Sequence, residues 1–88
     1  MFIVQNFYQA IQTRYLGPTN RSGARVKAFA KAGSYIVPWD HSADTDANHY
    51  QAAQALVSKL GWVAPNYGPI VGGVLPNGDY AFVMLPVA

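Results

Sequence analysis

The sequence predicts a small α+β domain: an antiparallel sheet of about five strands, in the order β-β-β-α-β-β, with one helix packed on one face. Three observations predict it. Short β-forming runs separated by Gly, Pro and Asn fill the first 39 residues, one segment with helical periodicity follows, and a hairpin signal lies near the end. A length of 88 residues suits one unit, so we expect 1–88 to form a single domain.

Three strands are expected within residues 10–39. The run AIQTRYL (10–16) alternates in polarity, GPTNRSG is dense in turn formers, and ARVKAFA (24–30) alternates again. After the short turn KAG, the run SYIVPW (34–39) is rich in β-formers until Pro38 interrupts ladder pairing. These runs predict a three-stranded meander.

The helix is expected within residues 44–61, where apolar residues recur at helical spacing and Lys59 suits the negative end of the dipole. Gly61 is a suitable residue to end it. Four residues near its start are able to cap the first turn, namely Ser42, Asp44, Thr45 and Asp46.

A hairpin is expected over residues 70–85, because Pro-Asn-Gly-Asp lies between two β-forming runs. Gly72 and Gly73 are expected to mark a bulge or a place where backbones pack closely. Residues 1–9 suit an extra strand, a helical turn or an arm that pairs between protomers, and the residues alone leave these alternatives open.

The charge is strongly segregated along the chain. Before Asp40 the sequence holds five cations and no acid, which gives a charge of +5. From Asp40 onward it holds four aspartates and one cation, Lys59, which gives a charge of −3. Charged residues make up only 11% of the chain, against about 25% in an average soluble domain. Either much of the surface is therefore polar but uncharged, or some apolar surface meets a partner or another copy. Such segregation bears on partners rather than on fold.

The basic N-terminal hairpin is the candidate functional surface. Arginine and lysine side chains on neighbouring strands are able to bind phosphate or carboxylate groups, turn glycines let backbone N–H groups approach an anion, and aromatic rings beside them offer stacking platforms. The alternative is an ordinary solvated sheet face with a turn that binds nothing. The candidate residues are Arg14, Asn20, Arg21, Arg25, Lys27, Phe29, Lys31 and Tyr35.

Several classes of function are disfavoured by what the sequence lacks. It has no cysteine for a disulfide or a thiolate metal site, no GxSxG, Walker or HExxH motif, and no recognised DNA-reading motif. His41 and His49 match no metal-ligand spacing, so we expect no enzyme activity, no metal and no cofactor. No apolar run is long enough to span a bilayer and the start is a poor signal peptide, so a cytoplasmic protein without membrane contact is expected.

The segments TRYLGPTNRSGARVKA, PWDH, NHYQAAQALVSKLGW and VGGVLPNGDYAFV occur here in order. With them, residues 10–84 resemble a group of small uncharacterised proteins of bacteriophages and integrated mobile elements. The resemblance implies a small protein that works inside a bacterial cell, as an accessory or counter-defence factor. It assigns no activity and no site residue to this chain.

The sequence therefore favours a non-enzymatic binding module that engages an anionic partner through the basic hairpin, with the backbone of nucleic acid preferred to an acidic protein surface. Two alternatives remain. One is a protein–protein inhibitor of a host defence effector, and the other is a homo-oligomeric structural or assembly protein.

Overall fold

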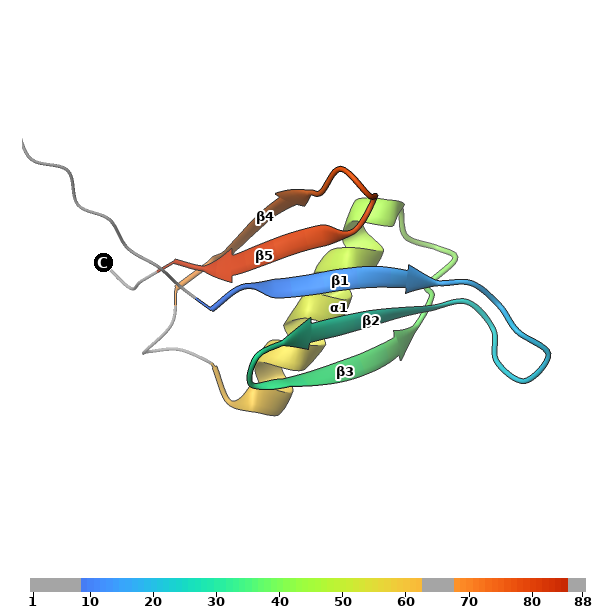
Figure 1. Ribbon diagram of the computed structural model, residues 1–88, viewed down its shortest axis with the longest axis horizontal. Coiled ribbons are helices and arrows are strands. Elements are labelled where there is room, and N and C mark those ends of the chain that lie inside the picture. The colour runs from blue at the N-terminus through green and yellow to red at the C-terminus, as the bar shows by residue number, and fades with distance from the viewer. Residues whose placement is uncertain (1–8, 63–67, 86–88) are drawn as a thin grey trace, which may run out of the picture.

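The computed structural model describes residues 9–62 and 68–85, and its architecture is the predicted one (Figure 1). The alternatives expected for residues 1–9, an extra strand, a helical turn or an arm, fall, apart from Gln9, outside the described residues and stay predictions. The strands are β1 (Ile11–Leu16), β2 (Arg25–Ala30), β3 (Gly33–Pro38), β4 (Ile70–Val74) and β5 (Tyr80–Met84), and the helix is α1 (Thr45–Leu60).

The first strand of the chain, β1, lies at the centre of the sheet. The strand order is β3-β2-β1-β5-β4, and every neighbouring pair is antiparallel. The predicted meander extends to one side of β1, and the C-terminal hairpin returns to the other side, where Ile11 is opposite Phe82 and Thr13 is opposite Tyr80. Pairing between the first and the last strand therefore joins the two halves of the domain.

The helix begins and ends as its sequence predicts. Asp44 is the N-cap, and its Oδ1 accepts a hydrogen bond from the Ala47 N–H at 2.8 Å. Gly61 ends the helix with a φ of 74°, in the left-handed region that favours glycine, and its N–H donates to the Ser58 carbonyl at 3.2 Å. No helix in the described part of the chain is long and apolar enough to cross a membrane.

A buried asparagine fixes the loop that leads into α1. The side-chain oxygen of Asn48 accepts from the Asp40 N–H at 2.7 Å. Its Nδ2 donates to the carbonyls of Asp40, Ala43 and Asp44 at 2.9, 3.3 and 3.0 Å. Because an unpaired buried polar group costs about 1–3 kcal/mol, these bonds hold the loop against the first turn of the helix.

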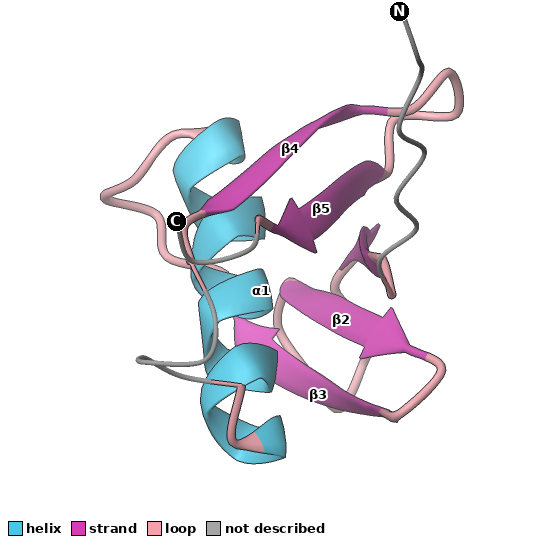
Figure 2. Cartoon of the chain, turned by 90° about the vertical axis from the view of Figure 1, so that its left-hand side faces the viewer, coloured by secondary structure: helices cyan, strands magenta, loops and turns pink. Residues whose placement is uncertain are grey.

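The core lies between α1 and one face of the sheet, and the helix packs mainly against β1, β2 and β3 (Figure 2). Small side chains on the helix, such as Ala52 and Ala53, allow it to approach the sheet closely. Trp39 and Trp62 are partly buried and pack against the core. The buried apolar residues are Ile11, Val26, Ala28, Ala52, Ala53, Leu56, Val57 and Phe82.

A buried histidine links α1 to the central strand. His49 is 2% exposed, its Nδ1 shares a hydrogen bond of 2.6 Å with the Oγ1 of buried Thr13, and its ring stacks on Tyr80 with the centroids 4.2 Å apart. Burial lowers the pKa of His49 below its ordinary value of 6.5, although the charges of Asp79 and Asp46 act in the opposite direction. The neutral form of His49 is therefore the one that the folded protein favours.

Replacing Gly72 by alanine is expected to destabilise the fold. A Cβ at Gly72 would lie 2.3 Å from Phe82 Cδ1 and 2.5 Å from the Ala81 carbonyl oxygen. The prediction that the chain packs closely at Gly72 is therefore confirmed. Overpacking of this kind costs about 1–3 kcal/mol, which urea denaturation would record as a lower midpoint. Gly73→Ala is the matched control, because its Cβ would meet nothing within 4 Å. Equal midpoints for the two variants would contradict the packing described here.

The pKa of His49 predicts how stability depends on pH. Below pH 6.5 the unfolded chain takes up a proton at His49 that the folded protein resists, so stability present above pH 6.5 is lost as the pH falls toward the lower folded-state pKa. One such group contributes at most about 1.4 kcal/mol per pH unit. Urea denaturation between pH 7.5 and 5 measures the loss.

Variants at the two histidines separate this effect from general acid sensitivity. His49→Gln is expected to flatten the dependence of stability on pH in this window, while His41→Gln, at the exposed histidine, leaves it unchanged. An unaltered slope in His49→Gln would show that another group is responsible.

Candidate functional site

Strand register places three of the predicted cations on one face of the sheet. Arg14 is opposite Lys27, and Leu16 is opposite Arg25. Neighbours along a strand point to opposite faces, and Thr13, which precedes Arg14, is buried under α1. The side chains of Arg14, Arg25 and Lys27 therefore project from the face that the helix leaves uncovered, which we call the open face.

Phe29 gives the open face an apolar centre. Phe29 also points away from the helix, because its neighbours Ala28 and Ala30 lie on the core side. The Cζ of Arg14 lies 5.5 Å from the centroid of the Phe29 ring, and the Nζ of Lys27 lies 5.6 Å from it. Both contacts are within the range of cation–π attraction, so the ring positions two of the three charges.

A buried aspartate partly neutralises Arg14. The Oδ2 of Asp79 accepts hydrogen bonds from Gln12 Nε2 at 2.8 Å, from Arg14 Nε at 2.9 Å and from Asn77 Nδ2 at 3.3 Å. Arg14 Nη2 also lies 2.9 Å from this oxygen, the only ion pair among the described residues, and Asp79 is 7% exposed. Burial alone would raise the pKa of Asp79, but the bonds from Gln12 and Arg14 outweigh it and lower the pKa below its usual 3.8.

The other two cations of the open face are not neutralised in this way. Arg25 and Lys27 form no ion pair within residues 9–62 and 68–85, and the Nε of Arg25 is covered without a hydrogen-bond partner among these residues. Their charge is therefore available to a ligand, while part of the charge of Arg14 is shared with Asp79.

The loop between β1 and β2 extends beyond the end of the sheet (Figure 1). It exposes two of the predicted residues, Asn20 and Arg21. Its backbone is less available than expected, because the N–H groups of Arg21 and Ser22 both donate to Thr19 Oγ1, at 3.3 and 3.1 Å, and the Thr19 N–H donates to the Ser22 carbonyl at 2.7 Å. The loop therefore offers side chains rather than a backbone nest.

Two predicted residues lie away from this cluster. Tyr35 is opposite Ala28, a core residue, so its side chain belongs to the helix side of the sheet, where the Nζ of Lys59 lies 5.7 Å from its ring centroid. Lys31 lies in the β2–β3 turn, at the other end of β2 from the long loop. The expectation that Tyr35 stacks beside the cations of the open face is wrong. The register of β3 with β2 places the odd-numbered residues of β3 on the helix side of the sheet.

The two histidines lie in different environments. His49 is buried and bonded to Thr13, whereas His41 is exposed in the loop before α1. The described residues hold no group of three His, Cys, Asp or Glu side chains able to bind a metal ion.

Sequence reasoning missed Asp79 as a member of the site. Asp79 is 65 residues from Arg14, and only the pairing of β5 with β1 brings them together. The signal available in the sequence was the position of a lone acid at the end of a hairpin turn, directly before a β-forming run.

Comparison with protein-family models, with curated proteins and with solved structures finds no match to this chain.

Proposed function

We propose that this protein is a non-enzymatic binding module that holds the backbone of nucleic acid on the open face of its sheet. The observation that carries the proposal is the cluster of Arg14 and Lys27 around Phe29, with Arg25 on the same face. Arg21 and Asn20 in the protruding loop extend the contact surface, and Asp79 is the acid that limits its charge.

The chemistry of these side chains suits phosphate. Guanidinium groups donate two parallel hydrogen bonds to an oxyanion, and Lys27 adds a compact charge. An uncovered sheet face with an aromatic ring among cations is a recurrent way to hold single-stranded nucleic acid. The acids Asp44 and Asp46 belong to α1 and its cap, on the other side of the sheet, so they do not oppose a strand bound to the open face.

The proposed setting is the cytoplasm of a bacterial cell, in a bacteriophage or an integrated mobile element, because the segments quoted above resemble proteins from these sources. In that setting a small module acts by occupying nucleic acid rather than by altering it. An accessory or counter-defence role requires no catalytic group.

A second candidate is an inhibitor that binds a host protein, and the exposed apolar side chains favour it. Tyr35 and Ile36 on β3, and Tyr15 on β1, are all more than two-fifths exposed. A complex formed through such residues would depend only weakly on salt, whereas phosphate contacts make affinity fall steeply as salt rises. Binding at two salt concentrations therefore separates the two candidates.

The double variant Arg25→Ala, Lys27→Ala tests the open face. We expect it to bind a fluorescent single-stranded oligonucleotide about tenfold more weakly at low salt than the wild type. Since each phosphate contact contributes about −0.7 to the slope of log affinity against log salt, the slope should become shallower by about 1.4. Fluorescence anisotropy over a salt series measures both quantities.

The matched control removes the same charge from outside the open face. Lys31→Ala, Lys59→Ala is expected to keep most of the affinity, because Lys31 lies in a turn and Lys59 on the helix. Far-UV circular dichroism checks that both double variants fold. Equal losses in the two variants would mean that overall charge, and not this face, controls binding.

Replacing Asp79 by asparagine is expected to tighten binding. The change removes the acid of the open face and releases the Arg14 guanidinium, so the salt slope should steepen by up to about 0.7. Asp44→Asn is the control, because it removes the same charge on the helix side while asparagine still caps the helix. If Asp79→Asn binds no more tightly than Asp44→Asn, Arg14 does not belong to the site.

A further inference from the structure

The two edges of the sheet are protected to different degrees. At the β3 edge, Lys59 Nζ donates to the carbonyl of Ser34 at 2.7 Å, and Pro38 ends the strand. A lysine and a proline at an edge both discourage the addition of another strand. At the β4 edge the sequence is IVGGV, which contains neither a charge nor a proline.

The hydrogen bonds of the C-terminal hairpin show which backbone groups of β4 point outward. The Leu85 N–H donates to the Pro69 carbonyl at 2.9 Å, and the Leu75 N–H donates to the Asp79 carbonyl at 2.6 Å. Bonding alternates along an antiparallel strand, so the odd-numbered residues between them pair with β5. The N–H and C=O groups of Ile70, Gly72 and Val74 therefore point away from the sheet.

Within residues 9–62 and 68–85, no side chain bonds to these outward groups of Ile70, Gly72 and Val74. Val74 is 65% exposed, the largest exposure among the large hydrophobic residues of this part of the chain. An edge of this kind is a template for an added strand.

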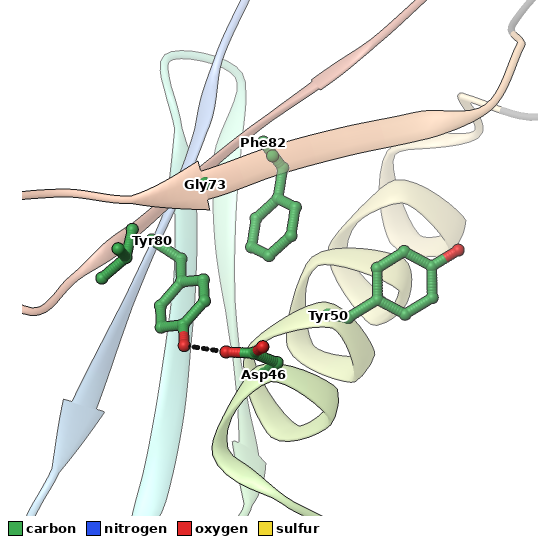
Figure 3. Close-up of a pocket in the computed structure, with 7 residues that line it drawn as sticks. Asp46, Tyr50, Gly73, Tyr80 and Phe82 are labelled. Atoms are coloured by element: carbon green, nitrogen blue, oxygen red, sulfur yellow. Dashed lines mark hydrogen bonds between the residues drawn. The ribbon is translucent and has the colours of Figure 1, made fainter.

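A groove runs beside this edge on the helix side of the sheet, with a volume of about 340 Å³. Figure 3 shows Phe82 and Tyr50 along it, and the Tyr80 hydroxyl donating to the carboxylate of Asp46 at one end. The Asp46 carboxylate raises the pKa of Tyr80 above its ordinary value of 10.0. The groove is lined by Asp46, Tyr50, Gly72, Gly73, Val74, Tyr80 and Phe82.

We propose that β4 is the dimerisation edge of this protein and that its occupant is the β4 strand of a second copy. The outward residues map onto themselves when the strand is reversed about Gly72. Antiparallel pairing then sets Gly72 against Gly72 of the second copy and Ile70 against its Val74, and every outward N–H and C=O gains a partner. Such an interface is isologous and closes after two copies.

Charge does not oppose a second copy at this edge. The edge strand β4 and its neighbour β5 carry no charged residue, and the cations Arg14, Arg25 and Lys27 lie on β1 and β2. Arg14 and its counterpart would be separated by five strand spacings, on the order of 24 Å. This exceeds the Debye length of about 8 Å at physiological salt, so the two basic regions repel each other only weakly.

The dimer would form one ten-stranded sheet. The twofold axis between antiparallel edge strands is perpendicular to the sheet, so both helices lie on one side and both open faces lie on the other. The pairing itself does not depend on nucleic-acid binding. In the dimer a nucleic-acid strand would meet two basic regions, and two linked sites bind more tightly than one. Only this consequence rests on the function proposed above.

Sedimentation velocity over a wide concentration range, on protein freed of nucleic acid, tests the pairing. The wild type should reach the mass of two chains as its concentration rises. Val74→Lys should stay at the mass of one chain, because it puts a charge on the pairing strand, opposite Ile70 of the second copy, while its exposed position lets the monomer fold. Ile36→Lys, at a similarly exposed residue of the opposite edge strand, should dimerise like the wild type.

The outcomes that overturn the proposal are distinct. A wild type that stays monomeric at every concentration refutes the dimer. A dimer that survives Val74→Lys, or that Ile36→Lys dissociates, refutes its location at β4. Neither result bears on nucleic-acid binding, which the open-face variants test separately.

A disulfide tests the register. The proposed pairing sets Val71 against Gly73 of the second copy in a pair without hydrogen bonds, where Cα atoms are about 4.5 Å apart. The chain has no cysteine of its own, and a Cβ at Gly73 meets nothing within 4 Å. Val71→Cys, Gly73→Cys should therefore give a covalent dimer on mild oxidation, and a variant that stays monomeric on a denaturing gel contradicts this register.

Discussion

One helix is able to cover only one face of a five-stranded sheet, and this constraint organises the molecule. Side chains alternate between the faces of a strand, so burying Thr13 and Ala28 beneath α1 obliges their neighbours Arg14 and Lys27 to face solvent. The positive surface is thus a consequence of how the core is built. A shift of β1 by one residue would turn Arg14 toward the core and expose Ile11 and Thr13, which makes the register strongly specified.

The same constraint turns charge segregation along the chain into charge segregation in space. Capping and the helix dipole favour acids at the start of α1, where Asp44 and Asp46 lie, while the open face on the other side of the sheet collects cations. Asp79 is the exception, because it directly precedes β5, which pairs with the central strand β1. Its bonds with Gln12 and Arg14 tie the C-terminal hairpin to β1 and also moderate the charge of the open face.

The sequence predicted those features that depend on local chemistry. The limits of α1 follow from Asp44 and Gly61, and the C-terminal hairpin from its Asn-Gly turn, all of which act over a few residues. That Arg14 and Lys27 share one face of the sheet could be predicted only by assuming the register in which β1 pairs with β2. What could not be predicted depends on contacts distant in sequence: the return of β5 to β1, which brings Asp79 to Arg14, and the burial of His49 against Thr13.

Because the helix covers the sheet unevenly, the two halves of the sheet are held to the domain by different contacts. The helix packs mainly against β1, β2 and β3, so the β4–β5 hairpin is held to the domain by the β1–β5 ladder and by a short aromatic stack that includes His49 and Tyr80. A domain of this size buries only about 60–65% of the surface of its unfolded chain. The edge strand β4 lies outside the main helix contacts and therefore has surface to bury against a neighbouring strand. It presents a backbone without charge and, at its two glycines, without side chains.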